Sequence, residues 1–263
     1  MAITAYRKIG GVEITFSDST AHVFPRHSHD EFYIGANLSG REKIWLDGHS
    51  TEASIDDITV YNPGQVQAAT PTPYNWLYYS FYLQPTLVCE LTGLPADEQF
   101  RRSVFSAPDM AGHIRETAAF SLHLAHSDND VMERIAGLLA EVARHAGTYT
   151  RCLFGHKDVV LAASVASQLM DEMASPPALE TLAQRYGLTP VQLVRVFSSA
   201  YGMPPYTWLR GEKLKIAKQR ILNGQPISSL AADLGFSDQA HFTRNFKNMF
   251  GITPGVLSRL VKP

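Results

Sequence analysis

Hydrophobic and polar positions tend to alternate with a period of two in the first part of this chain. Turn-forming residues interrupt the pattern, and Ser39-Gly40 and Asp47-Gly48 are expected to be turns between strands. Short strands at this spacing predict an antiparallel barrel or a sandwich. The predicted strands, rich in β-branched and aromatic residues, are 12–16, 31–38, 42–46, 58–61 and 76–83.

Further along the chain the apolar positions recur at helical spacing. Segments 109–125 and 130–145 predict two amphipathic helices beside the barrel. Their apolar stripes have two interpretations, because they could form a subunit interface or pack against their own domain. Residues 147–156 show no clear period, so we expect a linker there, followed by a helix at 157–173.

The helical part of the chain repeats itself. The segment 179–189 (LETLAQRYGLT) is similar to 227–237 (ISSLAADLGFS) at an offset of 48 residues, and the similarity continues at an offset of 49. This near-constant register indicates two copies of one structural unit. The matching positions are Leu182-Ala183 with Leu230-Ala231, Gly187 with Gly235, and then Leu193, Arg195, Phe197, Gly202 and Pro205 with Phe242, Arg244, Phe246, Gly251 and Pro254.

Each copy has the boundary residues of a helix-turn-helix unit. In the first copy, Gly187 can take the positive φ that ends a helix. Thr189 is a good N-cap for the next helix, and Pro190 suits its first position because the missing N–H costs nothing there. In the second copy, Gly235 is expected to end the first helix and Ser237 to cap the next one.

A helix predicted at 206–222 joins the two copies. At 1.5 Å per residue it is roughly 25 Å long, so it could hold the second helices of the two copies near one DNA turn apart, ~34 Å. Both helices could then enter successive major grooves on one face of a duplex.

The outward positions of these two second helices are the candidate DNA-contacting residues. Gln and Arg can each contact a base edge through two hydrogen bonds, and Thr can meet a thymine methyl group. Because two valines in the first copy allow only apolar contact, we expect that copy to discriminate bases less sharply. The alternative is that polar residues merely solvate an exposed helix face. The candidates are Gln192, Val194 and Arg195, after the exposed Val191, and then Gln239, His241, Thr243 and Arg244.

Charge is distributed unevenly along the 263 residues. The whole chain has a formal net charge of −2. Residues 1–156 hold 11 Lys and Arg against 18 Asp and Glu, whereas residues 157–263 hold 12 against 7. A basic module is what phosphate neutralisation needs, because cationic side chains release the counterions condensed on DNA.

Several classes of protein find no support in the sequence. No window approaches ~18 uninterrupted apolar residues, so no membrane span is predicted. The segment 1–8 lacks the apolar stretch of a signal peptide, so the cytoplasm is the expected location. Cys89 and Cys152 match no metal or redox spacing. No Ser/His/Asp or Cys/His arrangement and no phosphate-binding glycine loop is evident, so we expect no catalytic residues and no enzyme activity.

Residues 157–259 resemble the DNA-binding domain of the AraC/XylS family of transcription regulators. The resemblance implies a double-stranded DNA partner, bound in its major groove by helices that start near Pro190 and Asp238. It also implies a homodimer on paired or direct-repeat sites and activation of transcription, for which RNA polymerase would be a partner. The resemblance is carried by 182–190, 193–197 with Gly202, 216–217, 227–247 and 251–254.

The N-terminal part resembles, less specifically, the cupin-type ligand-binding domain of the same family, through 24–35, 39–40 and 62–64. The implied fold class is a multidomain α+β protein, with a cupin-like β-barrel and flanking helices before an all-α bundle that holds the two helix-turn-helix units. A small-molecule effector would bind the barrel, with His27, His29, Glu31 and Tyr33 near its mouth or lining. The expected domains are 1–105 (barrel), 106–146 (helices and candidate dimerisation region), 147–156 (linker) and 157–263 (DNA binding).

The same residues raise the question of a metal site. His27, His29 and Glu31, spaced two apart on a strand, would face the same way, and such ligands suit Fe, Mn or Zn. Metal-binding cupins resemble this pattern, but they place the carboxylate further along and add a histidine after a later Pro-Gly. Here 63–69 (PGQVQAA) has glutamines and no histidine. We therefore expect neither a metal nor another cofactor, and local hydrogen bonding of the histidines is an equal interpretation to effector binding.

Two functions stay open beside that of a ligand-responsive regulator. One is a cupin enzyme, such as a metal-dependent oxygenase or isomerase, that carries a DNA-binding appendage. The other is a regulator that senses a partner protein and fills its barrel with its own side chains. The interior of the barrel is the feature that distinguishes these alternatives.

Overall fold

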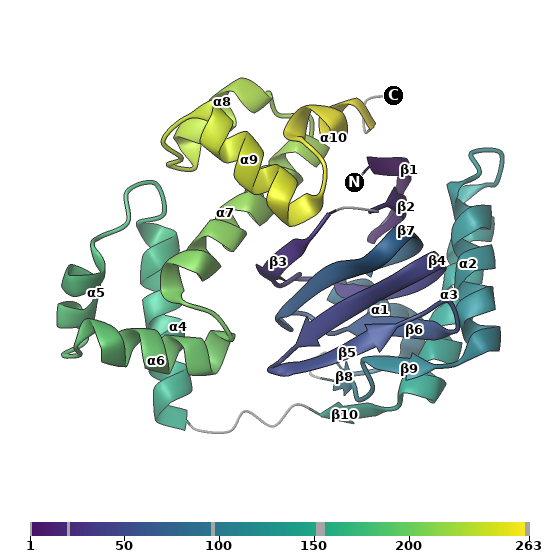
Figure 1. Cartoon of the computed structure of the whole chain (residues 1–263), viewed down its shortest axis with the longest axis horizontal. Helices are drawn as coiled ribbons and strands as arrows, with labels where there is room; N and C mark the ends of the chain where they lie inside the picture. The colour runs from purple at the N-terminus through teal and green to yellow at the C-terminus, as the bar shows by residue number, and fades with distance from the viewer. Residues whose placement is uncertain (1, 20–21, 96–97, 151–155, 261–263) are drawn as a thin grey trace. The chain divides into compact units, whose positions relative to one another are not determined.

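The computed structural model describes residues 2–19, 22–95, 98–150 and 156–260, and the chain divides into two compact units, 1–151 and 152–263. Within the expected linker, residues 151–155 lie outside the described part. None of the described helices is long and apolar enough to cross a membrane. The first unit contains β1 (Ala2–Ile9), β2 (Val12–Asp18), β3 (Phe24–His27), β4 (Phe32–Leu46), β5 (His49–Ala53), β6 (Asp57–Tyr61), β7 (Gln67–Leu83), α1 (Pro85–Thr92), β8 (Glu98–Phe100), β9 (Val104–Ser106), α2 (Pro108–Leu122), α3 (Asp128–Ala146) and β10 (Thr148–Thr150) (Figure 1).

The long strands β4 and β7 organise the first unit. They pair antiparallel from Phe32 opposite Leu83 to Leu46 opposite Gln67. Each long strand has different neighbours along its two halves, because β4 also pairs with β6 and β5, and β7 also pairs with β2 and β3. The result is one eight-stranded sheet with the order β1-β2-β7-β4-β6-β9, to which β3 and β5 are added on β7 and β4.

The expected turn at Ser39-Gly40 is wrong, because β4 runs through it without interruption. The pairing register with β7 shifts on both sides of Ser39, which marks a β-bulge. Gly40 has a φ of 78°, and a Cβ there would lie 2.7 Å from the Asn75 carbonyl oxygen. The glycine therefore allows an irregularity inside one long strand. The predicted strands 31–38 and 42–46 are the two halves of that strand.

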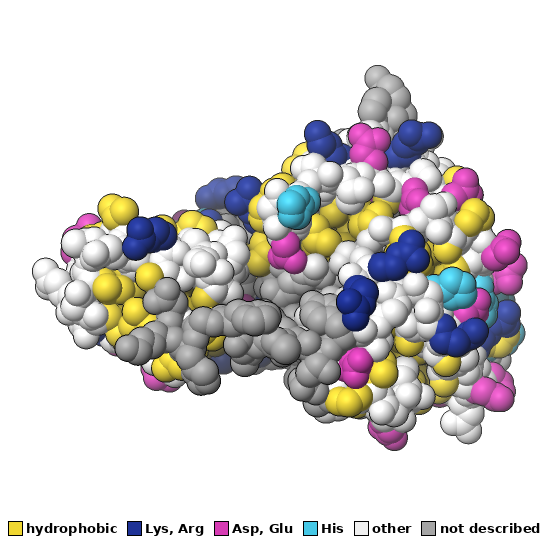
Figure 2. All heavy atoms as spheres, turned by 90° about the horizontal axis from the view of Figure 1, so that it is seen from below, with side chains coloured by type: hydrophobic (Ala, Val, Ile, Leu, Met, Phe, Trp, Pro, Cys, Tyr) yellow, Lys and Arg dark blue, Asp and Glu magenta, His cyan; other side chains and the backbone are white. Residues whose placement is uncertain are grey.

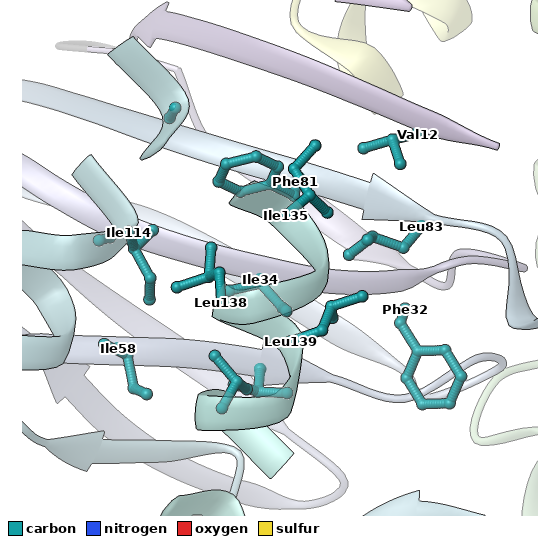
Figure 3. Close-up of a cluster of buried hydrophobic side chains, with 14 of the residues drawn as sticks. Val12, Phe32, Ile34, Ile58, Phe81, Leu83, Ile114, Ile135, Leu138 and Leu139 are labelled. Atoms are coloured by element: carbon teal, nitrogen blue, oxygen red, sulfur yellow. The ribbon is translucent and has the colours of Figure 1, made fainter. Parts of the chain in front are cut away.

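Helices α2 and α3 cover one face of the sheet (Figure 1). Side chains alternate between the faces of a strand, so Phe32 and Ile34 of β4 join the core under the helices, whereas Tyr33 belongs to a separate cluster. Figure 3 shows this core, to which Ile114 of α2 and Leu138 of α3 contribute. The apolar stripes of the two predicted amphipathic helices are therefore buried within their own unit.

The second unit is entirely helical in its described residues. The two copies of the sequence repeat are α5–α6 and α8–α9, and α7, with 18 residues, joins them over roughly 27 Å. This confirms the predicted all-α part with two helix-turn-helix units. The helices are α4 (His156–Asp171), α5 (Leu179–Arg185), α6 (Pro190–Tyr201), α7 (Pro205–Leu222), α8 (Ile227–Asp233), α9 (Gln239–Phe250) and α10 (Pro254–Leu260).

The turn between the helices is built in the same way in both copies. A glycine with φ of 66° or 64° follows the first helix, and a buried or half-buried apolar residue follows the glycine. This is a Schellman motif, in which two N–H groups bond back to the last turn of the helix. The bonds run from Gly187 to Gln184 and Leu188 to Ala183 in the first copy, and from Gly235 to Ala232 and Phe236 to Ala231 in the second.

Candidate functional sites

The first unit contains a cavity whose lining comes from both halves of the long strands. Its volume is about 40 Å³, which is room for about three water molecules or a small organic group at the ~10–15 Å³ that one water needs. The barrel is therefore not filled completely by its own side chains. The lining residues are Phe24, His27, His29, Tyr33, Glu42, Tyr61, Gln67, Ala69, Trp76, Tyr78 and Tyr82.

Three of the four predicted effector-binding residues, His27, His29 and Tyr33, line this cavity. Glu31 is half-buried and is not among the lining residues. The expectation that one strand carries His27, His29 and Glu31 is wrong, because β3 ends at His27 and β4 begins at Phe32. The strand alternation on which that expectation depended does not extend through the connection.

The two histidines bind each other. Nδ1 of His27 lies 2.7 Å from the Pro25 carbonyl oxygen, and its Nε2 lies 3.1 Å from Nε2 of His29. A carbonyl oxygen only accepts, so neutral His27 carries its proton on Nδ1, and its Nε2 accepts from the N–H of His29. Among the residues that the structure describes, no three His, Cys, Asp or Glu side chains lie close enough together to hold a metal ion.

Two polar lining residues, Glu42 and Gln67, were not predicted. Glu42 is only 4% exposed, and burial raises the pKa of its carboxyl group to about 8. Gln67 is 5% exposed, and its Oε1 has no hydrogen-bond partner within the described part of the chain. The sequence carried a signal for Glu42, because it shares the buried face of β4 with Ile44, whereas Arg41 and Lys43 are exposed.

Aromatic side chains form most of the remaining wall. Tyr33 stacks on Tyr61 with ring centroids 5.0 Å apart, and Trp76 stacks on Tyr78 at 4.5 Å. Burial raises the pKa of Tyr33, Tyr61 and Tyr78 above the ordinary value, so these phenols are neutral near pH 7. None of the described residues that line the cavity is Lys or Arg. The lining therefore contains an acidic group, Glu42, and no permanent cation.

In the first helix-turn-helix unit, a capping box fixes the start of α6. The Thr189 hydroxyl accepts from the Gln192 N–H at 3.3 Å, and Gln192 Oε1 accepts from the Thr189 N–H at 2.9 Å. A two-bond contact from Gln192 to a base would need that same oxygen. Arg195 is exposed, Val194 is half-buried and Val191 is 78% exposed. Figure 2 shows apolar side chains at the surface on the left, where α4–α6 lie.

In the second unit, the N-cap of α9 is Asp238 and not Ser237 as expected. The reason is geometric, because an N-cap side chain accepts from the N–H three residues on. Asp238 Oδ1 accepts from the His241 N–H at 2.6 Å, and this bond lowers the pKa of the Asp238 carboxyl group. The Ser237 hydroxyl instead lies 3.0 Å from Nδ1 of His241. His241 therefore takes part in the local structure of the turn.

The other candidate DNA-contacting residues of α9 lie on its outer side. Gln239 and Arg244 are exposed, and Thr243 is half-buried. Phe242 and Phe246, each 0% exposed, anchor the opposite face of the helix. The structure thus presents an Arg and a Gln at the surface of α9.

A barrel with a cavity, followed by two helix-turn-helix units, defines the class of two-domain transcription regulators. Residues 9–141 match the AraC-like ligand binding domain, and residues 182–259 match a helix-turn-helix domain family. The chain belongs to the AraC family of transcription regulators.

The chain is also similar to individual relatives and, in fold, to a solved structure. The chain is 33% identical over 85 residues to the virulence regulon transcriptional activator VirF of Yersinia enterocolitica, which is 32% of this chain and 31% of VirF. It is 32% identical over 98 residues to the multiple antibiotic resistance protein MarA of Escherichia coli, or 37% of this chain and 77% of MarA. The structure of apo ToxT K231A from Vibrio cholerae has a TM-score of 0.61 at 10% identity, covering 97% of this chain and 100% of that one. At that identity the likeness shows the fold alone.

Proposed function

We propose that this chain is a sequence-specific DNA-binding regulator, an activator of transcription, that inserts α6 and α9 into the major groove. The observation that carries the proposal is that two identically built turns each precede a helix with an exposed arginine, Arg195 and Arg244. The excess of 12 basic over 7 acidic residues in 157–263 supports contact with phosphates. VirF, a relative, is a transcriptional activator by name.

The barrel is proposed to sense a small-molecule effector in the cavity lined by His27, His29 and Tyr33. An open cavity and the match to a ligand-binding domain support this function over that of a barrel filled with side chains. A structure of ToxT, which shares this fold, has an unsaturated fatty acid bound. No observation favours a cupin metalloenzyme, because Glu31 does not line the cavity and the two histidines bind each other.

The proposal includes three further features that follow from a regulator of this class. The chain would act as a homodimer on paired or direct-repeat sites, would contact RNA polymerase when it activates, and would work in the cytoplasm. Effector binding would change the occupancy of DNA by a difference in affinity between the liganded and unliganded states.

A DNA-binding measurement with Arg244→Ala tests the proposal. The wild-type chain first selects its site from random duplexes, and fluorescence anisotropy then gives affinities across a range of salt concentrations. We expect Arg244→Ala to bind the selected site about 10- to 100-fold more weakly, as the loss of one good base contact costs about 1–3 kcal/mol. Arg41→Ala, the same change at an exposed position of β4, is the matched control and should bind as the wild type does. Equal binding by the wild type and Arg244→Ala would contradict the proposal.

A further inference from the structure

The effector cavity has acceptors that lack matching donors. The carboxyl group of Glu42 is buried, and no described residue forms an ion pair or hydrogen bond with it; burial alone accounts for its raised pKa. Gln67 contributes a second buried acceptor, because its Oε1 has no hydrogen-bond partner in the described part of the chain. A buried acceptor without a partner, such as Gln67 Oε1, is costly, and a ligand that donates to it and also pairs with Glu42 would remove that cost.

The histidines already use their protons within the protein. The Nδ1–H of His27 is directed to the Pro25 carbonyl oxygen, and one N–H lies between His27 and His29. The tyrosine hydroxyls can donate or accept and therefore select no particular ligand charge. The unpaired acid and the absence of Lys or Arg among the described lining residues are the two features that do select a charge.

The aromatic wall favours the same charge. Six lining residues carry phenyl, phenol or indole rings, whose faces attract cations through their quadrupole. A desolvated site strengthens this attraction as well as that of a carboxylate. The six are Phe24, Tyr33, Tyr61, Trp76, Tyr78 and Tyr82.

We propose that the cavity binds a small organic cation with N–H groups, an ammonium or guanidinium ion, which donates to the Glu42 carboxylate and to Gln67 Oε1. This inference rests on the proposed function, because it names the chemical class of the effector at the same site. An anionic ligand would find no cationic side chain in the lining to neutralise it, and it would disfavour ionisation of Glu42 further. A neutral ligand would leave Glu42 protonated and would form no ion pair with it.

Binding of the cation is coupled to a proton. In the empty cavity the Glu42 carboxyl group is protonated near pH 7, since its pKa is about 8. A bound cation favours the carboxylate, so Glu42 releases its proton to solvent when the cation enters below that pKa. Affinity for the cation should therefore rise as the pH approaches 8. The other titratable groups that face the cavity are His27, His29, Tyr33, Tyr61, Tyr78 and Tyr82.

Isothermal titration of the full chain tests the proposal with probes of matched shape. Guanidinium chloride at low millimolar concentration is compared with urea, which is planar and similar in size but neutral, and with acetate. We expect guanidinium to bind at least tenfold more tightly than urea or acetate. Titration in two buffers of different ionisation enthalpy should show release of a proton at about pH 7. Glu42→Gln, which keeps the shape of the side chain, should weaken guanidinium binding at least tenfold and abolish the proton release.

Three results would overturn the proposal: no binding of guanidinium, tighter binding of urea or acetate, or equal guanidinium affinity in Glu42→Gln. If the variant does not fold, the comparison of guanidinium with urea on the wild type decides alone. Glu52→Gln, the same change at an exposed position of β5, is the control and should bind guanidinium as the wild type does. The assay contains no DNA, so failure of the cation leaves the DNA-binding proposal standing. Loss of DNA binding in the Arg244→Ala test has no bearing on the cation.

Discussion

Individual side chains in this protein are constrained by neighbours that the sequence does not place beside them. Glutamate is usually exposed to solvent. The position of Glu42 on β4 instead directs its side chain into the barrel, where burial raises its pKa to about 8. Gln192 resembles a base-reading residue, but its Oε1 accepts the Thr189 N–H in a capping box. A Cβ on Gly35 would lie 2.5 Å from the Tyr33 hydroxyl oxygen, so a larger residue at position 35 would require the Tyr33 side chain to shift.

The stability of the chain should depend on pH through Glu42. Its carboxyl pKa is 4.5 in the reference state and about 8 when folded. Below pH 4.5 the group is neutral in both the folded and the unfolded chain, so its ionisation does not lower the free energy of unfolding there. Between these values the unfolded chain ionises while the folded chain does not, and the free energy of unfolding falls by ~1.4 kcal/mol per pH unit. The free energy of unfolding stops falling once the pH exceeds the folded pKa, because Glu42 is then ionised in both states.

Urea unfolding of the wild type and Glu42→Gln at about pH 5 and about pH 8 measures this effect. The glutamine does not ionise, so the variant should gain on the order of 3 kcal/mol relative to the wild type between the two conditions. Parallel pH profiles for the two proteins would show that Glu42 does not titrate as inferred. Glu52→Gln, at an exposed position, should follow the wild type.

At the scale of elements, the turns of the two helix-turn-helix units have the same backbone conformation but different surroundings. Gly187 and Gly235 have nearly equal φ values, 66° and 64°. A Cβ on Gly235 would lie 2.1 Å from the Ala174 carbonyl oxygen. Apart from its chain neighbours, no described residue has an atom within 4 Å of a Cβ on Gly187. In addition, Lys213 of α7, 7% exposed, donates to the Gly235 carbonyl oxygen at 3.4 Å. The turn at Gly235 is therefore packed against Ala174 and Lys213, whereas the turn at Gly187 has open space around it.

Alanine at these two glycines should separate backbone strain from packing. Gly187→Ala should cost about 1–2 kcal/mol of unfolding free energy, because only the left-handed conformation is penalised. Gly235→Ala should cost several kcal/mol, since the backbone near Ala174 must also move. Urea unfolding followed by helical circular dichroism gives both values, and each variant is the other's control. Equal losses would mean that the close approach to Ala174 does not constrain the turn.

At the scale of the whole molecule, acidic and basic residues are separated between the two units, and the two recognition helices differ. In α6, Val191 and Val194 offer apolar surface, and Gln192 is held by the capping box. In α9, Gln239 and Arg244 are exposed. We therefore propose different tasks for two helices of the same fold, in which α9 reads bases more finely and α6 contributes position and Arg195.

This division predicts unequal effects on sequence discrimination. Affinities of the wild type, Arg244→Ala and Val194→Ala are measured on the selected site and on duplexes that differ from it by single base pairs. Arg244→Ala should relax discrimination at one base pair by about 1–3 kcal/mol, and Val194→Ala should relax it less. A larger effect of Val194→Ala would reverse the proposed roles of the two helices.

Much of the second unit could be predicted from the sequence, because its boundaries are local. A helix ends where Gly187 takes a positive φ and begins where Thr189 caps it. The tight turn at Asp47-Gly48, with φ of 46° and 94°, was predicted for the same reason. Ser237 was assigned as a cap in error, since the choice between it and Asp238 depends on the geometry of one hydrogen bond.

Tertiary structure alone decided the first unit in detail. Strands β1, β3 and β5 have no predicted counterpart, because pairing with neighbouring strands, more than the local sequence, determines that they are strands. Gly40 has the sequence signal of a turn, but pairing with β7 makes it a bulge in a long strand. The cavity likewise unites Glu42 and Gln67 from different strands and leaves Glu31 outside. Sequence by itself thus determined where the helices of the two repeats begin and end, and it determined the family. The chemistry of the cavity arose only from contacts between residues that are distant in the sequence.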